Sequence, residues 1–173
     1  GKIAVTCFKV EHRIECWGFL FREIKQPRSV LPEKAKSFEI PAVYFSALQK
    51  GKDYTTKKGT IISNEEVTVP AKKGNSYAYC ADTLYVEQLS AIVKEVDLLY
   101  HETTYLKDQD AKAASRFHST TIQAATIAKL ANVGRLIIGH FSSKYDNVEP
   151  FLEEAKAVFE NTVLAEEGTC YFL

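Results

Sequence analysis

Strand-like and helix-like segments alternate along much of this chain, and this alternation is what most limits the folds it can adopt. Helical periodicity over Thr83–Lys94 is followed by the apolar run Val96–Tyr100, and Thr120–Leu130 is followed by Arg135–Gly139. Such pairs predict an α/β fold in which helices pack on a sheet. The other predicted elements are the strands Ile3–Val10, Cys16–Phe21, Ser76–Cys80 and Cys170–Leu173 and the helix Val148–Phe159.

The size and composition of the chain favour an ordinary globular protein. A length of 173 residues with 46% hydrophobic content predicts one domain with a sizeable core. The longest apolar runs have about six residues, whereas a membrane helix needs about 20, so no membrane contact is expected. The four cysteines form no CxxC pair, which predicts buried free thiols in a reducing, cytoplasmic setting; they are Cys7, Cys16, Cys80 and Cys170.

Residues 22–74 form a segment with a marked charge bias. They contain eleven Lys or Arg and six Asp or Glu, a surplus of five positive charges in a chain that is neutral overall. Four of the five prolines lie here, with a predicted short helix at Val43–Gln49 and a hairpin of Tyr54–Thr56 with Thr60–Ser63. The segment is therefore predicted to be an inserted arm. A basic arm suits a polyanion such as RNA, although a solubilising surface would carry the same charge.

Residues that bind metals or move protons follow four of the predicted strands. They are His12 after Ile3–Val10, Asp82 after Ser76–Cys80, His101 and Glu102 after Val96–Tyr100, and His140 after Arg135–Gly139. The remaining histidine, His118, precedes a helix that Ser119 or Thr120 can cap. Ligands of α/β proteins bind beyond the carboxyl ends of strands, so we expect these side chains to share one site.

His12, Asp82 and His140 are the predicted metal ligands, because imidazole and carboxylate commonly bind catalytic divalent cations. An Asp can bridge two cations about 3.5–4 Å apart, an arrangement that stabilises both oxygens of a phosphoryl displacement. Purely structural interpretations remain open. They are a surface ion pair for His12, helix capping for Asp82 and His118, hydrogen bonding at a strand end for His101 and Glu102, and simple burial for His140. The aromatic side chains are expected in the core; these include Tyr77, Tyr79, Phe117 and Phe141.

Five short motifs occur in a fixed order along the chain. They are Val10-Glu11-His12-Arg13-Ile14, Tyr79-Cys80-Ala81-Asp82-Thr83, His101-Glu102-Thr103-Thr104, His118-Ser119-Thr120 and His140-Phe141-Ser142-Ser143-Lys144-Tyr145. Together they resemble the C-terminal half of ribonuclease Z, the tRNA 3′-end processing endonuclease of the metallo-β-lactamase fold. The resemblance covers residues 1–173. It implies one half of an αββα sandwich with residues 22–74 as an exosite-like arm.

The resemblance also implies roles for individual residues. His12, Asp82 and His140 match zinc ligands of the family, with Asp82 bridging two Zn²⁺ ions. His118 matches a histidine that assists the scissile phosphate, and Glu102 would orient its imidazole. The substrate would be precursor tRNA, cut to release its 3′ trailer. The candidate tRNA contacts in the arm are Lys50, Lys52, Lys57 and Lys58.

The largest departure from the family concerns a motif that is N-terminal in the family. The HxHxDH motif, which supplies four zinc-binding positions and a general base, is absent from these residues. We therefore expect a piece of a longer polypeptide that is inactive alone and associates with a missing N-terminal half or with itself as a homodimer. Smaller departures are Ala81 for Gly, Lys144 for Arg, and Ala42 after Ile40-Pro41, where the family has Gly-Pro.

Two other functions are compatible with the same residues. One is a different phosphodiesterase or hydrolase of the metallo-β-lactamase fold, which would not need the basic arm. The other is a non-catalytic RNA-binding half-domain, whose RNA binding would survive loss of Asp82 or His140. The endoribonuclease interpretation instead expects those substitutions to abolish turnover and leave binding largely unchanged.

Overall fold

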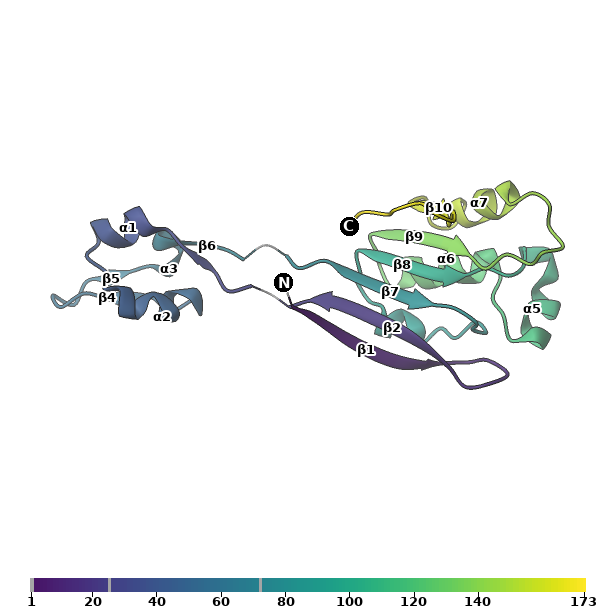
Figure 1. Ribbon diagram of the computed structural model, residues 1–173, viewed down its shortest axis with the longest axis horizontal. Coiled ribbons are helices and arrows are strands. Elements are labelled where there is room, and N and C mark those ends of the chain that lie inside the picture. Colours follow the sequence, from purple (N-terminus) through teal and green to yellow (C-terminus); the bar gives the residue numbers. More distant parts are fainter. Residues whose placement is uncertain (1, 25, 72) are drawn as a thin grey trace. The chain divides into compact units, whose positions relative to one another are not determined.

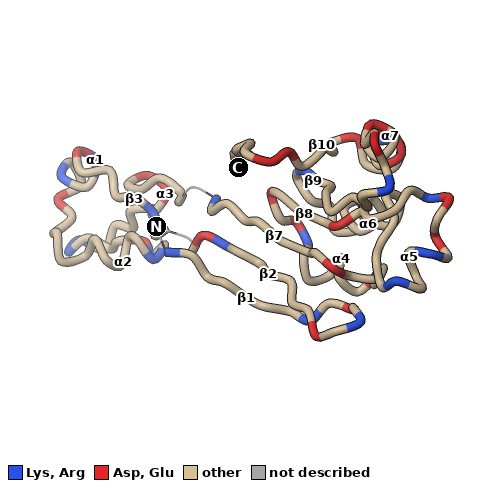
Figure 2. Tube along the Cα trace, turned by 45° about the vertical axis from the view of Figure 1, so that its right-hand side comes forward, with Lys and Arg blue, Asp and Glu red and all other residues tan. Residues whose placement is uncertain are grey.

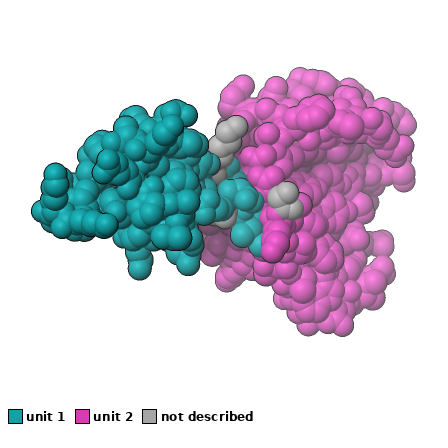
Figure 3. Space-filling view, turned by 60° about the vertical axis from the view of Figure 1, so that its left-hand side comes forward, with its two compact units in different colours: residues 1, 24–74 teal, residues 2–23, 75–173 magenta. Residues whose placement is uncertain are grey.

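The computed structural model describes residues 2–24, 26–71 and 73–173. The chain divides into two compact units, coloured separately in Figure 3. The sheet unit contains Lys2–Glu23 and Asn75–Leu173, and the arm unit contains Ile24–Gly74. Each unit has its own hydrophobic core, so each is described by itself.

A six-stranded sheet forms the centre of the sheet unit (Figure 1). Its order is β1 (Ile3–Val10), β2 (Cys16–Glu23), β7 (Ser76–Cys80), β8 (Leu98–Glu102), β9 (Arg135–Gly139) and β10 (Thr162–Leu164). Strand β2 is antiparallel to both β1 and β7, whereas β7, β8, β9 and β10 are parallel. The carboxyl ends of β1, β7, β8 and β9 therefore meet at one edge of the sheet.

Helices cover one face of this sheet. They are α4 (Leu89–Ile92), α6 (Thr121–Leu130) and α7 (Glu149–Lys156), while η2 (Lys107–Gln109) and α5 (Asp110–Arg116) lie in the connection from β8 to α6. Side chains alternate along each strand, and one set, including Ala78, Leu99 and Ile138, joins the helices in the core. Helix α6 begins with a capping box, in which Thr120 and Gln123 satisfy each other's backbone N–H groups.

The opposite set of strand residues forms an open aromatic face. Its members are Ile3, Val5, Trp17, Phe19, Phe21, Tyr77, Tyr79 and Tyr100, which the strand register places side by side. Val5 is 57% exposed and Trp17 is 44% exposed. The expectation that the aromatic residues lie in the core is wrong for Tyr79 and Phe117, each 37% exposed, and for Tyr77, which lies on this face outside the core. A sheet face of this composition is typical of a surface that another layer covers.

The arm unit is built from short elements around its own core. They are β3 (Ser29–Val30), α1 (Pro32–Ser37), η1 (Ala42–Tyr44), α2 (Phe45–Gln49), β4 (Tyr54–Thr55), β5 (Ile61–Ile62), α3 (Asn64–Val67) and β6 (Thr68–Val69). Leu48 and Val67 are fully buried in this core. Asn64 fastens the unit internally, because its Nδ2 donates to the carbonyl oxygens of Leu48 at 2.8 Å and Lys52 at 3.0 Å.

Several predicted elements differ from the structure. Cys170–Leu173 forms no strand, and the edge strand is instead Thr162–Leu164. The helix predicted within Thr83–Lys94 is reduced to Leu89–Ile92, because the residues before it are turn and coil. Strand β8 extends to Glu102, so that residue belongs to the strand rather than following it.

The cysteines only partly follow the prediction. All four are free, but Cys80 alone is buried, whereas Cys7 on the open side of β1 and Cys170 near the end of the chain are exposed. Among the described residues, no helix combines the length and the apolar character needed to cross a bilayer.

Candidate metal and phosphodiester site

Five of the predicted site residues meet at the edge where the strand carboxyl ends converge. His12 follows β1, Asp82 follows β7, Glu102 ends β8 and His140 follows β9, while His118 lies in the connection between α5 and α6. Together with Thr104 we call this group the strand-end cluster. These side chains were predicted to share one site because the carboxyl ends of parallel strands lie at the same edge of a sheet. The observed strand order has this arrangement.

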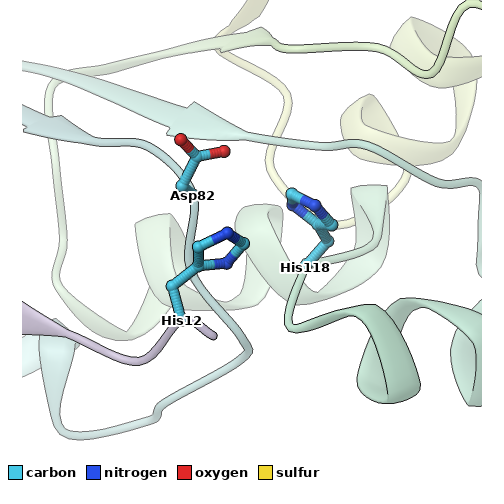
Figure 4. A group of neighbouring side chains, drawn as sticks. All are labelled: His12, Asp82 and His118. Atoms are coloured by element: carbon cyan, nitrogen blue, oxygen red, sulfur yellow. The ribbon is translucent and has the colours of Figure 1, made fainter. Parts of the chain in front are cut away.

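Two overlapping groups of ligand atoms are close enough to hold a cation. One consists of His12, Asp82 and His118 (Figure 4), and the other of Glu102, His118 and His140; within each group the ligand atoms lie within 4.8 Å of one another. Asp82 also lies near the second group, because its Oδ1 is 3.2 Å from His140 Nε2. The cluster thus brings carboxylate and imidazole donors together around two adjoining positions.

Asp82 and His140 both have left-handed backbone conformations. Their φ angles are 51° and 63°, values that cost a non-glycine residue of the order of 1–3 kcal/mol. His140 comes directly after β9 and Asp82 comes two residues after the end of β7, and their side chains approach to hydrogen-bond distance. Strain of this kind concentrates at functional sites, where the surrounding structure imposes it.

Glu102 is the buried centre of the cluster. Its Oε1 accepts hydrogen bonds from the backbone N of Thr83 at 2.9 Å and from His118 Nδ1 at 2.8 Å. Its Oε2 accepts from the backbone N and the hydroxyl of Thr104, at 3.1 and 2.7 Å. Burial raises the pKa of this carboxyl, but the hydrogen bonds from His118 and Thr104 outweigh it, so the pKa is below its ordinary value.

Thr104 connects Glu102 to His140 and fixes the tautomer of that histidine. The Thr104 hydroxyl has one proton, which it donates to the ionised Glu102 carboxylate. Its oxygen lies 2.9 Å from His140 Nδ1 and must therefore accept the Nδ1 proton. His140 Nε2 is then left with a free lone pair, and this is the atom that faces Asp82.

His12 and His118 are anchored in the same way. His12 Nδ1 lies 2.9 Å from the carbonyl oxygen of Phe117, which can only accept a hydrogen bond. His118 Nδ1 donates to Glu102, and this bond raises the pKa of His118 although burial opposes it. In metal sites, a ligating imidazole nearly always donates its second N–H to such an acceptor. The donor set therefore fits a divalent cation on its Nε2 atoms and the Asp82 carboxylate.

His101 is the strand-end histidine that does not join the cluster. It is fully buried on the helix-covered side of the sheet, and its Nδ1 lies 2.8 Å from the backbone oxygen of Glu102. Its Nε2 has no hydrogen-bond partner among the described residues. Burial lowers the pKa of His101, so the ring is a neutral part of the core.

The four candidate tRNA contacts are exposed residues of the arm unit. Lys50 and Lys52 follow α2, and Lys57 and Lys58 form the turn between β4 and β5. Their assignment to tRNA binding stays a prediction. The contributions of Thr104, Thr83 and the Phe117 carbonyl were not predicted, because a hydroxyl or a backbone group carries no recognisable signal in one sequence.

Curated relatives match this chain over nearly its whole length. A ribonuclease Z of Bacteroides fragilis is 39% identical over 171 residues, which is 99% of this chain and 56% of the relative. A ribonuclease Z of Cytophaga hutchinsonii is 43% identical over 176 residues, 99% of this chain and 55% of the relative. The chain thus spans about half the length of the curated relatives it matches. No protein-family model matches it.

Solved structures share the fold of this chain at low sequence identity. The metallo-β-lactamase fold protein YhfI from Bacillus subtilis superposes with a TM-score of 0.63 at 20% identity, over 98% of this chain and 49% of that protein. Human tRNase Z, short form (ELAC1), superposes with a TM-score of 0.53 at 21% identity, over 96% of this chain and 42% of that protein. The α/β fold of this chain is therefore that of part of a metallo-β-lactamase domain.

Proposed function

The chain is a homologue of ribonuclease Z over nearly all of its length, and we propose that the longer protein containing it is a zinc-dependent endoribonuclease that removes the 3′ trailer of precursor tRNA. The single observation that carries this proposal is the anchoring of three imidazoles beside Asp82. His12, His118 and His140 each have Nδ1 at hydrogen-bond distance from an acceptor oxygen, which leaves three Nε2 atoms for a cation or a phosphodiester.

We assign His12, Asp82 and His140 to two Zn²⁺ ions, with further ligands from the remainder of the protein. Bound zinc would supply positive charge that activates a water molecule and neutralises the charge developing on the phosphate. His118 also lies within reach of a cation. The hydrogen bond from its Nδ1 to Glu102 raises the pKa of His118, and we assign this ring to proton donation rather than to metal binding.

His118 and Glu102 act as the proton-donating pair in this proposal. Glu102 accepts the Nδ1 proton of His118 and holds the ring in one orientation. The Nε2 proton of the charged ring is then available to the oxygen that leaves when the phosphodiester is cut. Because Glu102 is itself held by three other hydrogen bonds, the pair needs little rearrangement to act.

Lys50, Lys52, Lys57 and Lys58 are proposed to bind the tRNA backbone at a distance from the bond that is cut. All four are exposed, and lysines of this kind bind phosphates as point charges without reading sequence. Their role depends on charge, so it should weaken with salt. With tRNA as the substrate, the activity would be cytoplasmic.

The open aromatic face is proposed to pack against the rest of the protein. Exposed aromatic rings such as Trp17, Phe19 and Tyr79 have the composition of a sheet-to-sheet contact. The occupant we favour is the part of the ribonuclease Z fold that this chain does not span. A second copy of the chain in a homodimer is the alternative occupant.

The test compares cleavage of precursor tRNA by the longer protein with cleavage by residues 1–173 alone. We expect EDTA-sensitive release of the trailer by the longer protein and no turnover by residues 1–173. Asp82→Ala or His140→Ala should reduce kcat by about 10³-fold or more, while tRNA affinity changes little. If the unsubstituted longer protein with added Zn²⁺ does not cut precursor tRNA, or if cleavage survives Asp82→Ala, the proposal is wrong.

A further inference from the structure

A pocket of about 340 Å³ adjoins the strand-end cluster. Its lining residues are Arg13, Tyr105, Ser115, Arg116 and His118. His118 also belongs to the cluster, where its ring centroid lies 5.1 Å from that of His12. A volume of this size is at the lower end of the range for small-ligand pockets, roughly 300–1,000 Å³. The pocket is thus large enough for one chemical group of a substrate bound at the cluster.

Two arginines line this pocket. Arg13 and Arg116 are exposed, and neither guanidinium forms an ion pair with a carboxylate in the part of the chain that the structure describes. The Nζ atoms of Lys112 and Lys144 each lie 5.5 Å from the centroid of the Tyr105 ring. Figure 2 shows basic residues along α5, and both basic and acidic residues in the connection between β1 and β2.

The neighbouring carboxylates do not cancel this charge by direct pairing. Glu102 is buried and accepts four hydrogen bonds. Asp110, at the start of α5, accepts a hydrogen bond from Gln123 at 2.7 Å, and Asp108 accepts one from Gln109 at 3.1 Å. The arginines therefore remain available to an anion that enters the pocket.

Phe117, which has a strained backbone conformation, connects the segments of the two arginines to the strand-end cluster. Phe117 ends α5 in the left-handed conformation, with φ of 60°, and its carbonyl oxygen lies 2.9 Å from His12 Nδ1. This hydrogen bond joins the segment that carries Arg13 to the helix end that carries Arg116. The positions of both guanidinium groups are thereby linked to a proposed metal ligand.

We propose that Arg13 and Arg116 form a phosphate-binding subsite beside His118, which holds the phosphate of the nucleotide next to the bond that is cut. The inference rests on the proposed function, because it needs an RNA chain at the strand-end cluster. The planar guanidinium presents two parallel N–H donors that match phosphate oxygens. An RNA substrate has a second phosphate that can bind to the two arginines, whereas a small molecule with a single phosphodiester has no second phosphate.

The experiment compares two substrates in the full-length protein loaded with Zn²⁺. Precursor tRNA has phosphates on both sides of the scissile bond, and bis(p-nitrophenyl) phosphate has one phosphate only. For Arg116→Ala we expect kcat/KM on precursor tRNA to fall about 10- to 100-fold, since a charge-assisted hydrogen bond is removed. The ratio of kcat/KM for the two substrates should fall at least tenfold, and Arg116→Lys should recover part of it.

Lys129→Ala is the matched control, because it removes an exposed positive charge at the other end of the neighbouring helix α6. It should leave the substrate ratio unchanged. Equal losses on both substrates in Arg116→Ala would mean that Arg116 only maintains the fold, and the subsite would be rejected. An unchanged ratio would reject it as well.

A binding measurement separates this inference from the proposed function. Affinity for a short single-stranded RNA is measured with EDTA present, at several salt concentrations. We expect Arg116→Ala to lower the slope of log affinity against log salt by roughly 0.7. If the protein cuts neither substrate, the proposed function fails, and the RNA-binding slope alone then supports or rejects the subsite.

Discussion

The sheet unit and the arm unit hold their functional residues in different ways. In the sheet unit, most candidate side chains are held by hydrogen bonds: Glu102 accepts four, Thr104 joins it to His140, and His12 lies against the Phe117 carbonyl. In the arm unit, the candidate residues Lys50, Lys52, Lys57 and Lys58 are exposed at the ends of short elements. Proton transfer and metal binding require fixed geometry, whereas binding of a polyanion requires mainly charge.

This difference predicts different responses to substitution. A change in the sheet unit should act on kcat or on metal affinity, because it disturbs positions within one hydrogen-bonded group. A change in the arm unit should act on KM and on the response to salt, because each lysine contributes separately. A sheet-unit substitution that changes only KM, or an arm-unit substitution that changes only kcat, would contradict this difference.

Glu102→Gln should have the largest effect. The amide cannot supply the negative charge that raises the pKa of His118, so less of the protonated ring is available. We expect kcat on precursor tRNA to fall about 10²- to 10⁴-fold, the usual contribution of general acid–base catalysis, with affinity nearly unchanged. Single-turnover cleavage measures this, and Glu66→Gln, an exposed residue of the arm unit, is the matched control. A loss below tenfold would contradict the role of the pair.

Thr104→Val should act on metal binding. Valine has nearly the same shape but lacks the oxygen that accepts the His140 Nδ1 proton, so the tautomer and orientation of His140 are no longer fixed. Loss of such an indirect partner typically costs 10- to 100-fold in metal affinity. Zinc titration with a competing chelator measures this change. Thr104→Ser retains the hydroxyl and should bind zinc nearly as tightly as the parent; equal weakening in both variants would instead indicate loss of packing.

Replacing Lys50, Lys52, Lys57 and Lys58 together by Ala should act on the substrate complex. We expect KM for precursor tRNA to rise roughly tenfold at moderate salt, and the salt dependence of affinity to decrease by about 0.7–0.9 for each phosphate that is no longer neutralised. The value of kcat at saturating substrate should stay within about twofold. A drop in kcat with unchanged KM would mean that these lysines do not bind tRNA.

The same contrast explains how much could be predicted from the sequence. The convergence of His12, Asp82 and His140 was predictable, because residues after parallel strands lie at one edge of a sheet. The hydroxyl of Thr104 was not, because its role depends on two distances in the folded chain. The exposure of Tyr79 was also missed, since an aromatic side chain on a strand looks the same whether its face is covered by the same chain or by another layer.

The last prediction concerns pH and the core of the sheet unit, and it involves stability rather than activity. Burial raises the pKa of the Cys80 thiol to about 12 from an ordinary value of 9.0. Between pH 9 and 12 the unfolded chain loses this proton while the folded chain keeps it. The stabilisation is therefore complete below pH 9 and is lost as the pH rises, by up to about 1.4 kcal/mol per pH unit.

Urea unfolding of the full-length protein at several pH values measures this effect. Cys80→Ala should reduce the alkaline decrease in the free energy of unfolding, whatever its effect on stability at neutral pH. Cys170→Ala removes an exposed thiol, so its free energy of unfolding should depend on pH in the same way as that of the parent. If Cys80→Ala and the parent lose stability equally between pH 9 and 11, then the thiol ionises while the protein is folded. The helix-covered face of the sheet would then be more open to water than its packing implies. The contrast between the sheet unit and the arm unit would be correspondingly smaller.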